Sequence, residues 1–183
     1  MTEPDLDAVR ARLAPHADVT YEPHQSPVGE LLACATDQGL VALALPCDDT
    51  DALLGRIAAQ LSPRIIRAGS RHVTATRRAL DAYFDGDAAD FDLPLDLSLT
   101  STFQRQVLSA LTGVRSGLTV SYSELATRAG SPAAVRATGT ALARNPIPIV
   151  VPCHRVLQRS GAVGNYRGGP EMKRKLLELE GVL

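Results

Sequence analysis

The stretch Asn145-Pro146-Ile147-Pro148-Ile149-Val150-Val151-Pro152-Cys153-His154-Arg155-Val156 places three reactive side chains directly after an apolar run. The run from Ile147 to Val151 is short, β-branched and bracketed by prolines, which predicts a buried extended segment. A thiol, an imidazole and a guanidinium follow, and the last two lower the pKa of a neighbouring thiol. The stretch alone fits an inert core cysteine equally well, because free Cys is among the most buried residue types.

The composition is that of an ordinary globular chain. Its 183 residues are 45% hydrophobic and 21% charged, which suits one domain of moderate size or two small ones. No stretch reaches the roughly 18 apolar residues of a membrane span, and residues 1–12 lack the regions of a signal peptide. We therefore expect an intracellular protein without a membrane partner, cytoplasmic or, in a eukaryote, nuclear. The three cysteines show no CxxC spacing, so no disulfide framework is expected.

The net charge of −1 conceals an asymmetry between the two halves. Residues 1–97 contain 8 Arg and Lys against 16 Asp and Glu, a balance of −8. Residues 98–183 contain 11 Arg and Lys against 4 Asp and Glu, a balance of +7. A basic half indicates a surface that meets a polyanion, although charge pairing between the halves would leave the same composition.

The first half predicts a small α/β domain. Alternating apolar residues over 28–45, interrupted by the turn Asp37-Gln38-Gly39, predict a β-hairpin. Helical spacing follows over 51–61 and again up to Phe84, with a short strand at 64–66 between them. The expected organisation is an unassigned segment 1–24, an α/β domain 25–90, a linker 91–98 and a helical domain 99–183.

The second half predicts a helix-turn-helix. Ser121-x-x-Glu124 is a capping box that starts one short helix, and Gly130 is a natural residue to end it. Ser131-Pro132 then predicts the start of a second helix, which runs to about Arg144. Two short helices joined around a glycine are typical of this motif.

The second helix of this pair is made almost entirely of small residues, among them Ala137 and Gly139, around the single long cation Arg136. Small side chains let a backbone approach a surface closely, as in the DNA minor groove, and Arg136 would then reach into the base stack. The alternative is an Ala-rich helix packed in a core, with Arg136 extending to solvent.

A glycine-rich loop and a last helix close the chain. Residues 160–169 carry backbone groups able to face a ligand, with Tyr166 as a possible wall. The last helix starts at Pro170, and its expected buried stripe is Met172, Leu176, Leu177 and Leu179. Glu180 lies at its C-terminal end, where the helix dipole disfavours a carboxylate, so we expect a partner such as a histidine.

These residues together resemble the O6-alkylguanine-DNA alkyltransferases, also called methylated-DNA–protein-cysteine methyltransferases. Residues 145–156 are similar to the active-site signature of that family. Further motifs fall in family order and spacing: Phe103-Gln104-x-x-Val107, Val120-Ser121-Tyr122-x-x-Leu125-Ala126, Val135-Arg136-Ala137-x-Gly139, Asn165-Tyr166-x-Gly168-Gly169 and Leu176-Leu177-x-x-Glu180. The likeness is strong over 98–183 and weak over 25–97. It implies an RNase-H-like α/β domain followed by a winged-helix-like, helical domain that carries the helix-turn-helix.

The resemblance also implies residue roles in direct DNA repair. Cys153 would take the alkyl group from guanine O6 in a suicide reaction, with His154 as a base acting through water. Glu180 would orient His154, and Asn145 would brace the turn that carries them.

The expected partner is double-stranded DNA containing O6-alkylguanine, bound by a protein that is monomeric in solution and needs no cofactor or metal. Base flipping would fall to Tyr122, Arg136, Ala137 and Gly139. The alkylguanine pocket would be lined by Val156, Tyr166, Arg167 and Gly168.

The sequence departs from the family pattern at Leu108, where many members carry Trp nearby, and at Arg167, where many carry a smaller residue. Arg167 would either narrow the pocket or hold a DNA phosphate. Some relatives bind zinc in the N-terminal half, but the histidines and cysteines here lack compact ligand spacing.

Two rival functions remain at this point. A DNA-damage sensor without transfer activity would lack the reactive cysteine, which is present here as Cys153. A cysteine hydrolase would need an oxyanion-hole motif, and none is evident.

Overall fold

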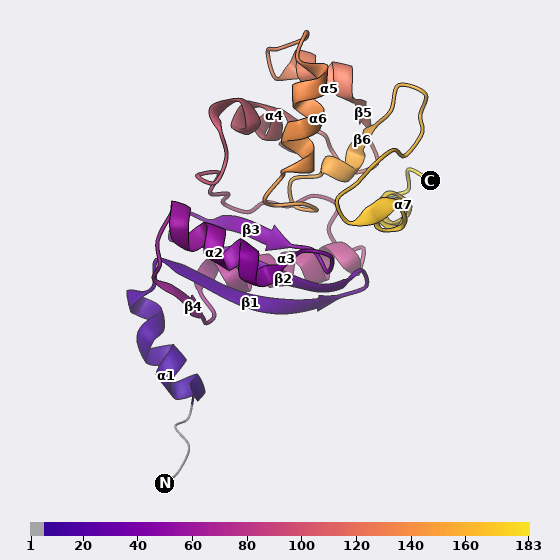
Figure 1. The fold of residues 1–183 in the computed structure, drawn as a ribbon. Coiled ribbons are helices and arrows are strands. Elements are labelled where there is room, and N and C mark those ends of the chain that lie inside the picture. The colour runs from indigo at the N-terminus through magenta and orange to yellow at the C-terminus, as the bar shows by residue number, and fades with distance from the viewer. Residues whose placement is uncertain (1–5) are drawn as a thin grey trace.

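The computed structural model describes residues 6–183, apart from the side chains of residues 6, 7 and 11. An α/β sheet domain and a helical domain lie against each other (Figure 1). The N-terminal elements are α1 (Leu6–Leu13), η1 (Ala14–His16), β1 (Val19–Ser26), β2 (Gly29–Ala35), β3 (Leu40–Ala44), α2 (Thr50–Gln60), β4 (Ile65–Arg67) and α3 (Arg71–Phe84). The C-terminal elements are α4 (Thr102–Thr112), β5 (Val120–Ser121), α5 (Tyr122–Arg128), α6 (Val135–Ala143), η2 (Cys153–Arg155), β6 (Val156–Leu157) and α7 (Gly169–Leu179).

The N-terminal sheet has the order β3-β2-β1-β4, with β2 antiparallel to both neighbours and β4 parallel to β1. The predicted hairpin is confirmed as β2 and β3, and the predicted strand at 64–66 is β4. Strand β1 was not predicted, and the expected domain start at residue 25 falls inside it. Strand β1 lies between two other strands, so it is a central part of the sheet. The sheet therefore includes the chain from Val19 onward.

The two domains share a hydrophobic core. One sheet face, with Leu31, contributes to a cluster that also contains Leu108 of α4 and Ile147 of the signature stretch. The other face, with Leu32, packs in a separate cluster with Ile57 of α2. This alternation is the two-residue period of a strand covered on both faces. The helical domain therefore replaces solvent on one face of the sheet, which fixes the position of the signature stretch.

The helix-turn-helix is present as α5 and α6. Ser121 and Glu124 form the predicted capping box, with the Glu124 carboxylate accepting from Ser121 N at 2.7 Å. Gly130 follows α5 with a φ of 75°, as a helix-ending glycine requires. The predicted start of α6 at Pro132 is wrong: a turn closed by Ala134 N donating to Ser131 O precedes the helix, which begins at Val135.

The signature stretch is buried, as predicted, but it is not extended. Val151 N donates to Ile147 O at 2.9 Å, so the chain turns back on itself before Cys153. Ile149 has a φ of 71°, in the left-handed region that β-branched residues avoid. The prediction of a strand at Ile147–Val151 is therefore wrong, and a tight, strained turn delivers the cysteine instead.

Helix α7 differs from its predicted stripe at two positions. Leu179 is exposed, whereas Lys173 is fully buried, together with Leu176 and Leu177. The long aliphatic stem of Lys173 suits the apolar face, and its ammonium group finds a carbonyl acceptor there. Among the helices of residues 6–183, none has the length and apolar character needed to cross a bilayer.

Candidate active site

The turn that carries Cys153 is held by the side chain of Asn145. The Asn145 Oδ1 accepts from Ile147 N at 3.0 Å, and its Nδ2 donates to Val151 O at 2.9 Å. The same Nδ2 is 3.3 Å from Cys153 Sγ. One amide therefore bridges both ends of the strained turn and also donates to the sulfur. A donor aimed at sulfur stabilises the thiolate relative to the thiol.

The Cys153 thiol is buried, and the groups around it shift its pKa in opposite directions. Burial raises its pKa, while the Asn145 hydrogen bond and the positive charges of Arg167 and Lys173 act in the opposite direction. The net direction is upward, so the thiol keeps its proton at neutral pH in the resting protein. A base must remove that proton before the sulfur can act as a nucleophile.

His154 and Glu180 supply such a base. The His154 Nε2 lies 2.8 Å from Glu180 Oε1, and both side chains are excluded from solvent. Burial lowers the pKa of His154 despite the opposing carboxylate, which favours a neutral ring that donates from Nε2. Among the described residues, the buried Nδ1 has no hydrogen-bond partner. The ring therefore has a lone pair on Nδ1 with which to accept a proton.

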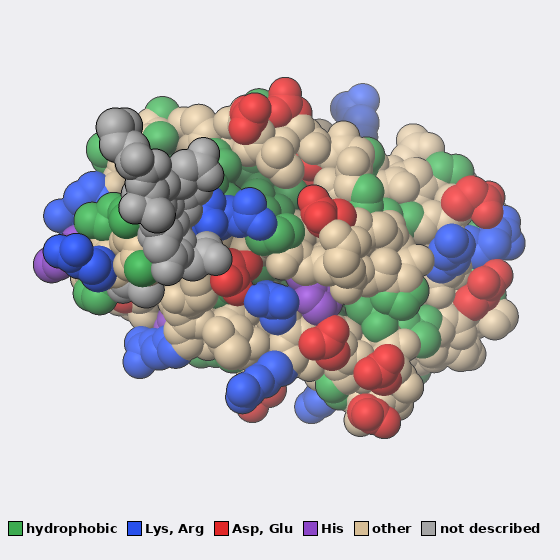
Figure 2. Space-filling model, turned by 90° about the horizontal axis from the view of Figure 1, so that it is seen from below, with side chains coloured by type: hydrophobic (Ala, Val, Ile, Leu, Met, Phe, Trp, Pro, Cys, Tyr) green, Lys and Arg blue, Asp and Glu red, His purple; other side chains and the backbone are tan. Residues whose placement is uncertain are grey.

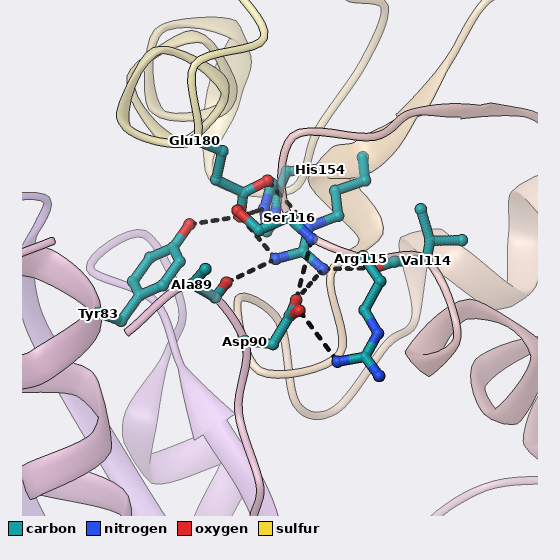
Figure 3. A network of polar contacts seen from close by, with 9 residues as sticks. Tyr83, Ala89, Asp90, Val114, Arg115, Ser116, His154 and Glu180 are labelled. Atoms are coloured by element: carbon teal, nitrogen blue, oxygen red, sulfur yellow. Dashed lines mark hydrogen bonds and ion pairs between the residues drawn. The ribbon is translucent and has the colours of Figure 1, made fainter. Parts of the chain in front are cut away.

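Glu180 is the centre of a network that crosses the two domains (Figure 3). Its carboxylate accepts from Arg155 Nε and Nη2, each at 2.9 Å, and from Tyr83 Oη of α3 at 2.8 Å. Arg155 also donates to Asp90 at 2.9 Å, before the helical domain begins. Burial raises the pKa of Glu180, but the hydrogen bonds from His154 and Arg155 outweigh it and bring the pKa to about 2.

A cavity of about 440 Å³ opens beside the thiol. It is lined by residues of α5, α6, the signature stretch and the glycine-rich loop: Tyr122, Gly139, Leu142, Ala143, Cys153, Asn165, Tyr166 and Arg167. Its volume falls within the usual range for a small-molecule site. The hydroxyl of Tyr166 is buried without a hydrogen-bond partner among the described residues, so a ligand with a polar edge would find an unused donor and acceptor.

The four residues predicted to line the pocket divide into two pairs. Tyr166 and Arg167 line the cavity. Val156 is fully buried in β6, and its carbonyl accepts from Lys173 Nζ at 2.6 Å. Gly168 packs against Tyr166, Leu45 and Met172, where an added Cβ would lie 2.3 Å from the Met172 sulfur. Val156 and Gly168 thus stand behind the wall of the cavity.

Arg167 does not extend toward solvent to meet a phosphate. Its Nη2 lies 3.0 Å from Asp48 Oδ2, between β3 and α2, and its Nη1 donates to Asn145 O at 3.0 Å. The Cys47 thiol donates to the backbone carbonyl of Arg167. Of the two roles expected for Arg167, this geometry favours a wall of the pocket.

Two of the four predicted base-flipping residues, Tyr122 and Gly139, line the cavity. Tyr122 is the first residue of α5 and lies against Gly139 of α6, where an added Cβ would be 3.8 Å from the ring. Arg136 and Ala137 are exposed on α6. The side of the molecule seen from below shows acidic and basic side chains interspersed (Figure 2).

Three contributors were missed from the sequence: Tyr83, Asp90 and Lys173. Tyr83 and Glu180 are separated by 97 residues, and no local pattern announces such a pair. Lys173 was detectable, because it lies one turn before Leu176 and Leu177 on the apolar face of α7. Burial lowers the pKa of Lys173 to about 8. In residues 6–183, no group of three or more His, Cys, Asp or Glu side chains is placed to hold a metal ion.

Two family models match the chain. Residues 19–97 match the ribonuclease-like domain of 6-O-methylguanine DNA methyltransferase. Residues 102–182 match the DNA-binding domain of the same protein. Together these models cover the sheet domain, including β1, and the helical domain.

Curated relatives point the same way. The Methylated-DNA--protein-cysteine methyltransferase of Methanothermobacter thermautotrophicus is 44% identical over 112 residues, which cover 59% of this chain and 62% of that protein. The chain thus spans less than two thirds of this relative's length. The protein of the same name from Methanosarcina barkeri is 36% identical over 160 residues, covering 87% of this chain and 96% of that protein.

A solved structure agrees with these relatives. Mycobacterium tuberculosis OGT in complex with DNA is similar with a TM-score of 0.74 and 36% identity, over 88% of this chain and 92% of that one. Both domains of the chain are thereby matched by one family. The chain belongs to the methylated-DNA–protein-cysteine methyltransferase family.

Proposed function

We propose that this chain repairs DNA directly, by transferring the alkyl group of O6-alkylguanine to its own Cys153, once per protein molecule. The observation that carries the proposal is a buried thiol with an amide donor, next to a buried histidine–glutamate pair, at a cavity of about 440 Å³. An inert core cysteine would need neither the strained turn nor the cavity.

Apart from a water molecule, the reaction needs no group from outside the protein and the DNA. A water molecule carries the Cys153 proton to Nδ1 of His154. The Nε2–H group of the same ring stays hydrogen-bonded to Glu180. The thiolate attacks the alkyl carbon, a C–S bond forms, and the C–O6 bond breaks with its electrons going to the guanine. The guanine anion then takes up the proton that His154 holds and leaves the site as normal guanine. Because the product on Cys153 is a stable thioether, the protein is consumed.

The substrate is double-stranded DNA, and the target base must leave the stack to reach a buried sulfur. Tyr122 at the cavity mouth would direct the nucleotide inward, and Arg136 would fill the space it leaves. Ala137 and Gly139 allow α6 to approach the backbone closely. We further propose that the protein acts inside the cell as a monomer.

The decisive experiment is the intact mass of the protein after incubation with a duplex that contains one O6-methylguanine. We expect a gain of one methyl group on Cys153, limited to one equivalent, and no gain in Cys153→Ser. The Cys34→Ser variant is the matched control, because Cys34 is also a buried thiol but lies in β2 on the α2 side of the sheet.

Three results would contradict the proposal. An unmodified wild-type protein would indicate a damage sensor, and release of alkyl groups beyond one equivalent would indicate a hydrolase. Labelling that persists in Cys153→Ser and disappears in Cys34→Ser would move the nucleophile to the wrong cysteine.

A further inference from the structure

Arg167 stands between two hollows in the molecule. The first is the cavity that holds the Cys153 sulfur. The second, of about 320 Å³, lies beside α2 and is lined by Leu43, Asp48, Ala52, Arg56 and Pro146, among others. Arg167 is the lining residue that the two hollows share. Its side chain therefore separates the space around the reactive sulfur from a second space of comparable size.

The position of this side chain depends on the N-terminal domain. Asp48, which pairs with the guanidinium at 3.0 Å, is itself held by Leu45 N donating to its Oδ2 at 2.8 Å. The other anchor is the Asn145 carbonyl at 3.0 Å. Arg167 Nε is buried without a hydrogen-bond partner among the described residues. Since an unpaired buried donor is unfavourable, the closed position relies on those two contacts.

Arg167 also lines the same cavity as the reacting sulfur. Its positive charge opposes the effect of burial on the pKa of Cys153, which places it within electrostatic reach of the sulfur. In the proposed reaction, the alkyl carbon must lie in line with this sulfur. Whatever is attached beyond that carbon then occupies the space next to Arg167. A methyl group needs little of this space, whereas a benzyl group needs room for a ring.

We propose that Arg167, held in place by Asp48, is the residue that limits the size of the alkyl group this chain accepts. Displacement of its side chain joins the two hollows and admits larger groups. The inference rests on the proposed alkyl transfer and adds its substrate range. It also gives the N-terminal domain, through Asp48, a part in selecting the substrate.

The test compares single-turnover transfer from two matched duplexes, one with O6-methylguanine and one with O6-benzylguanine, with the protein in excess. The ratio of the two rate constants removes effects common to both, such as a change in thiol reactivity. We expect the benzyl-to-methyl ratio to rise at least tenfold in Arg167→Ser. In Asp48→Asn the ratio should rise several-fold, because the neutral amide holds the guanidinium less tightly.

The Arg56→Ala variant is the control, because it removes an exposed arginine that lines the second hollow but not the cavity around Cys153. Its ratio should equal that of the wild type. If methyl transfer is retained and the benzyl-to-methyl ratio stays within twofold of wild type in both Arg167→Ser and Asp48→Asn, Arg167 does not limit the size of the alkyl group. That result would leave the proposed function intact. Absence of methyl transfer in the wild type would overturn the proposed function itself.

Discussion

His154 is fixed in one protonation state by its surroundings. Burial lowers its pKa below the ordinary 6.5, and the Glu180 carboxylate accepts a hydrogen bond from the Nε2–H group. A base with a lowered pKa becomes protonated only at a more acidic pH than an ordinary histidine. The rate of alkyl transfer should therefore stay level from pH 8 to pH 7 and decline only as the pH falls below about 6.5, where the ring takes up a proton.

Replacement of His154 by Gln tests this role directly. The amide keeps a donor for Glu180 but has no lone pair basic enough to take the thiol proton. We expect the single-turnover rate to fall on the order of 10²-fold and to lose its decline in mild acid. DNA affinity, measured by fluorescence anisotropy, should stay within twofold of wild type. His72→Gln, on the N-terminal domain, is the control, and a rate loss of equal size there would contradict the assignment.

At the scale of elements, the sequence predicts best what a few neighbouring residues determine. The Ser121–Glu124 box and Gly130 fix both ends of α5 through contacts within ten residues, and both predictions are confirmed. Strand β1 was missed because its sequence, with Pro23 and His24, lacks clear alternation. Its place in the sheet comes from pairing with β2 and β4.

The signature stretch shows why an apolar, β-branched run need not be a strand. Its turn is imposed by the Asn145 side chain, and Pro146 O accepts from Leu43 N of β3 at 2.8 Å. That partner lies about a hundred residues away, so no local pattern reports it. The identity of Cys153, His154, Asn145 and Glu180 as one group could be predicted by resemblance. The support from Tyr83, Asp90 and Lys173 could not, because it depends on how the domains pack.

The two exposed arginines near the ends of helix α6 lead to a separate prediction about duplex DNA. Arg136 is exposed near its start, and Arg144 is exposed just after its end. If Arg136 replaces the flipped base, Arg136→Ala should slow transfer from duplex DNA by about tenfold or more and leave transfer from free O6-methylguanine within twofold, because free base needs no flipping. Transfer to Cys153 is measured by intact mass on both substrates.

Arg144→Ala separates a wedge from a general charge effect. It removes the same charge from a position just after the same helix, so it should weaken duplex binding slightly and change the transfer rate at saturating DNA little. Equal rate losses in the two variants, or an equal loss on free base in Arg136→Ala, would contradict the wedge.

At the scale of the whole molecule, Glu180 links the chemistry to stability. It lies at the end of α7 and binds Tyr83 of the sheet domain, His154 and Arg155. Its pKa is about 2 in the folded protein, below the ordinary value of 4.5. Its contribution to the free energy of unfolding is therefore present above pH 4.5 and is lost as the pH falls toward 2. The full contribution is about 3 kcal/mol, of which about 2 kcal/mol should disappear between pH 5 and pH 3.

Glu180→Gln should remove this dependence, since an amide does not titrate. At pH 7 we expect it to lower the free energy of unfolding by about 3–5 kcal/mol, because Arg155 keeps a buried charge with less compensation. Between pH 5 and pH 3 it should lose about 2 kcal/mol less than the wild type. Urea unfolding across this pH range measures both quantities, with Glu178→Gln, an exposed change on the same helix, as the control. If the free energies of unfolding of the wild type and of Glu180→Gln fall in parallel with acid, the titrating carboxylate is another residue. The group that orients His154 would then not be the group that makes the two-domain packing depend on pH.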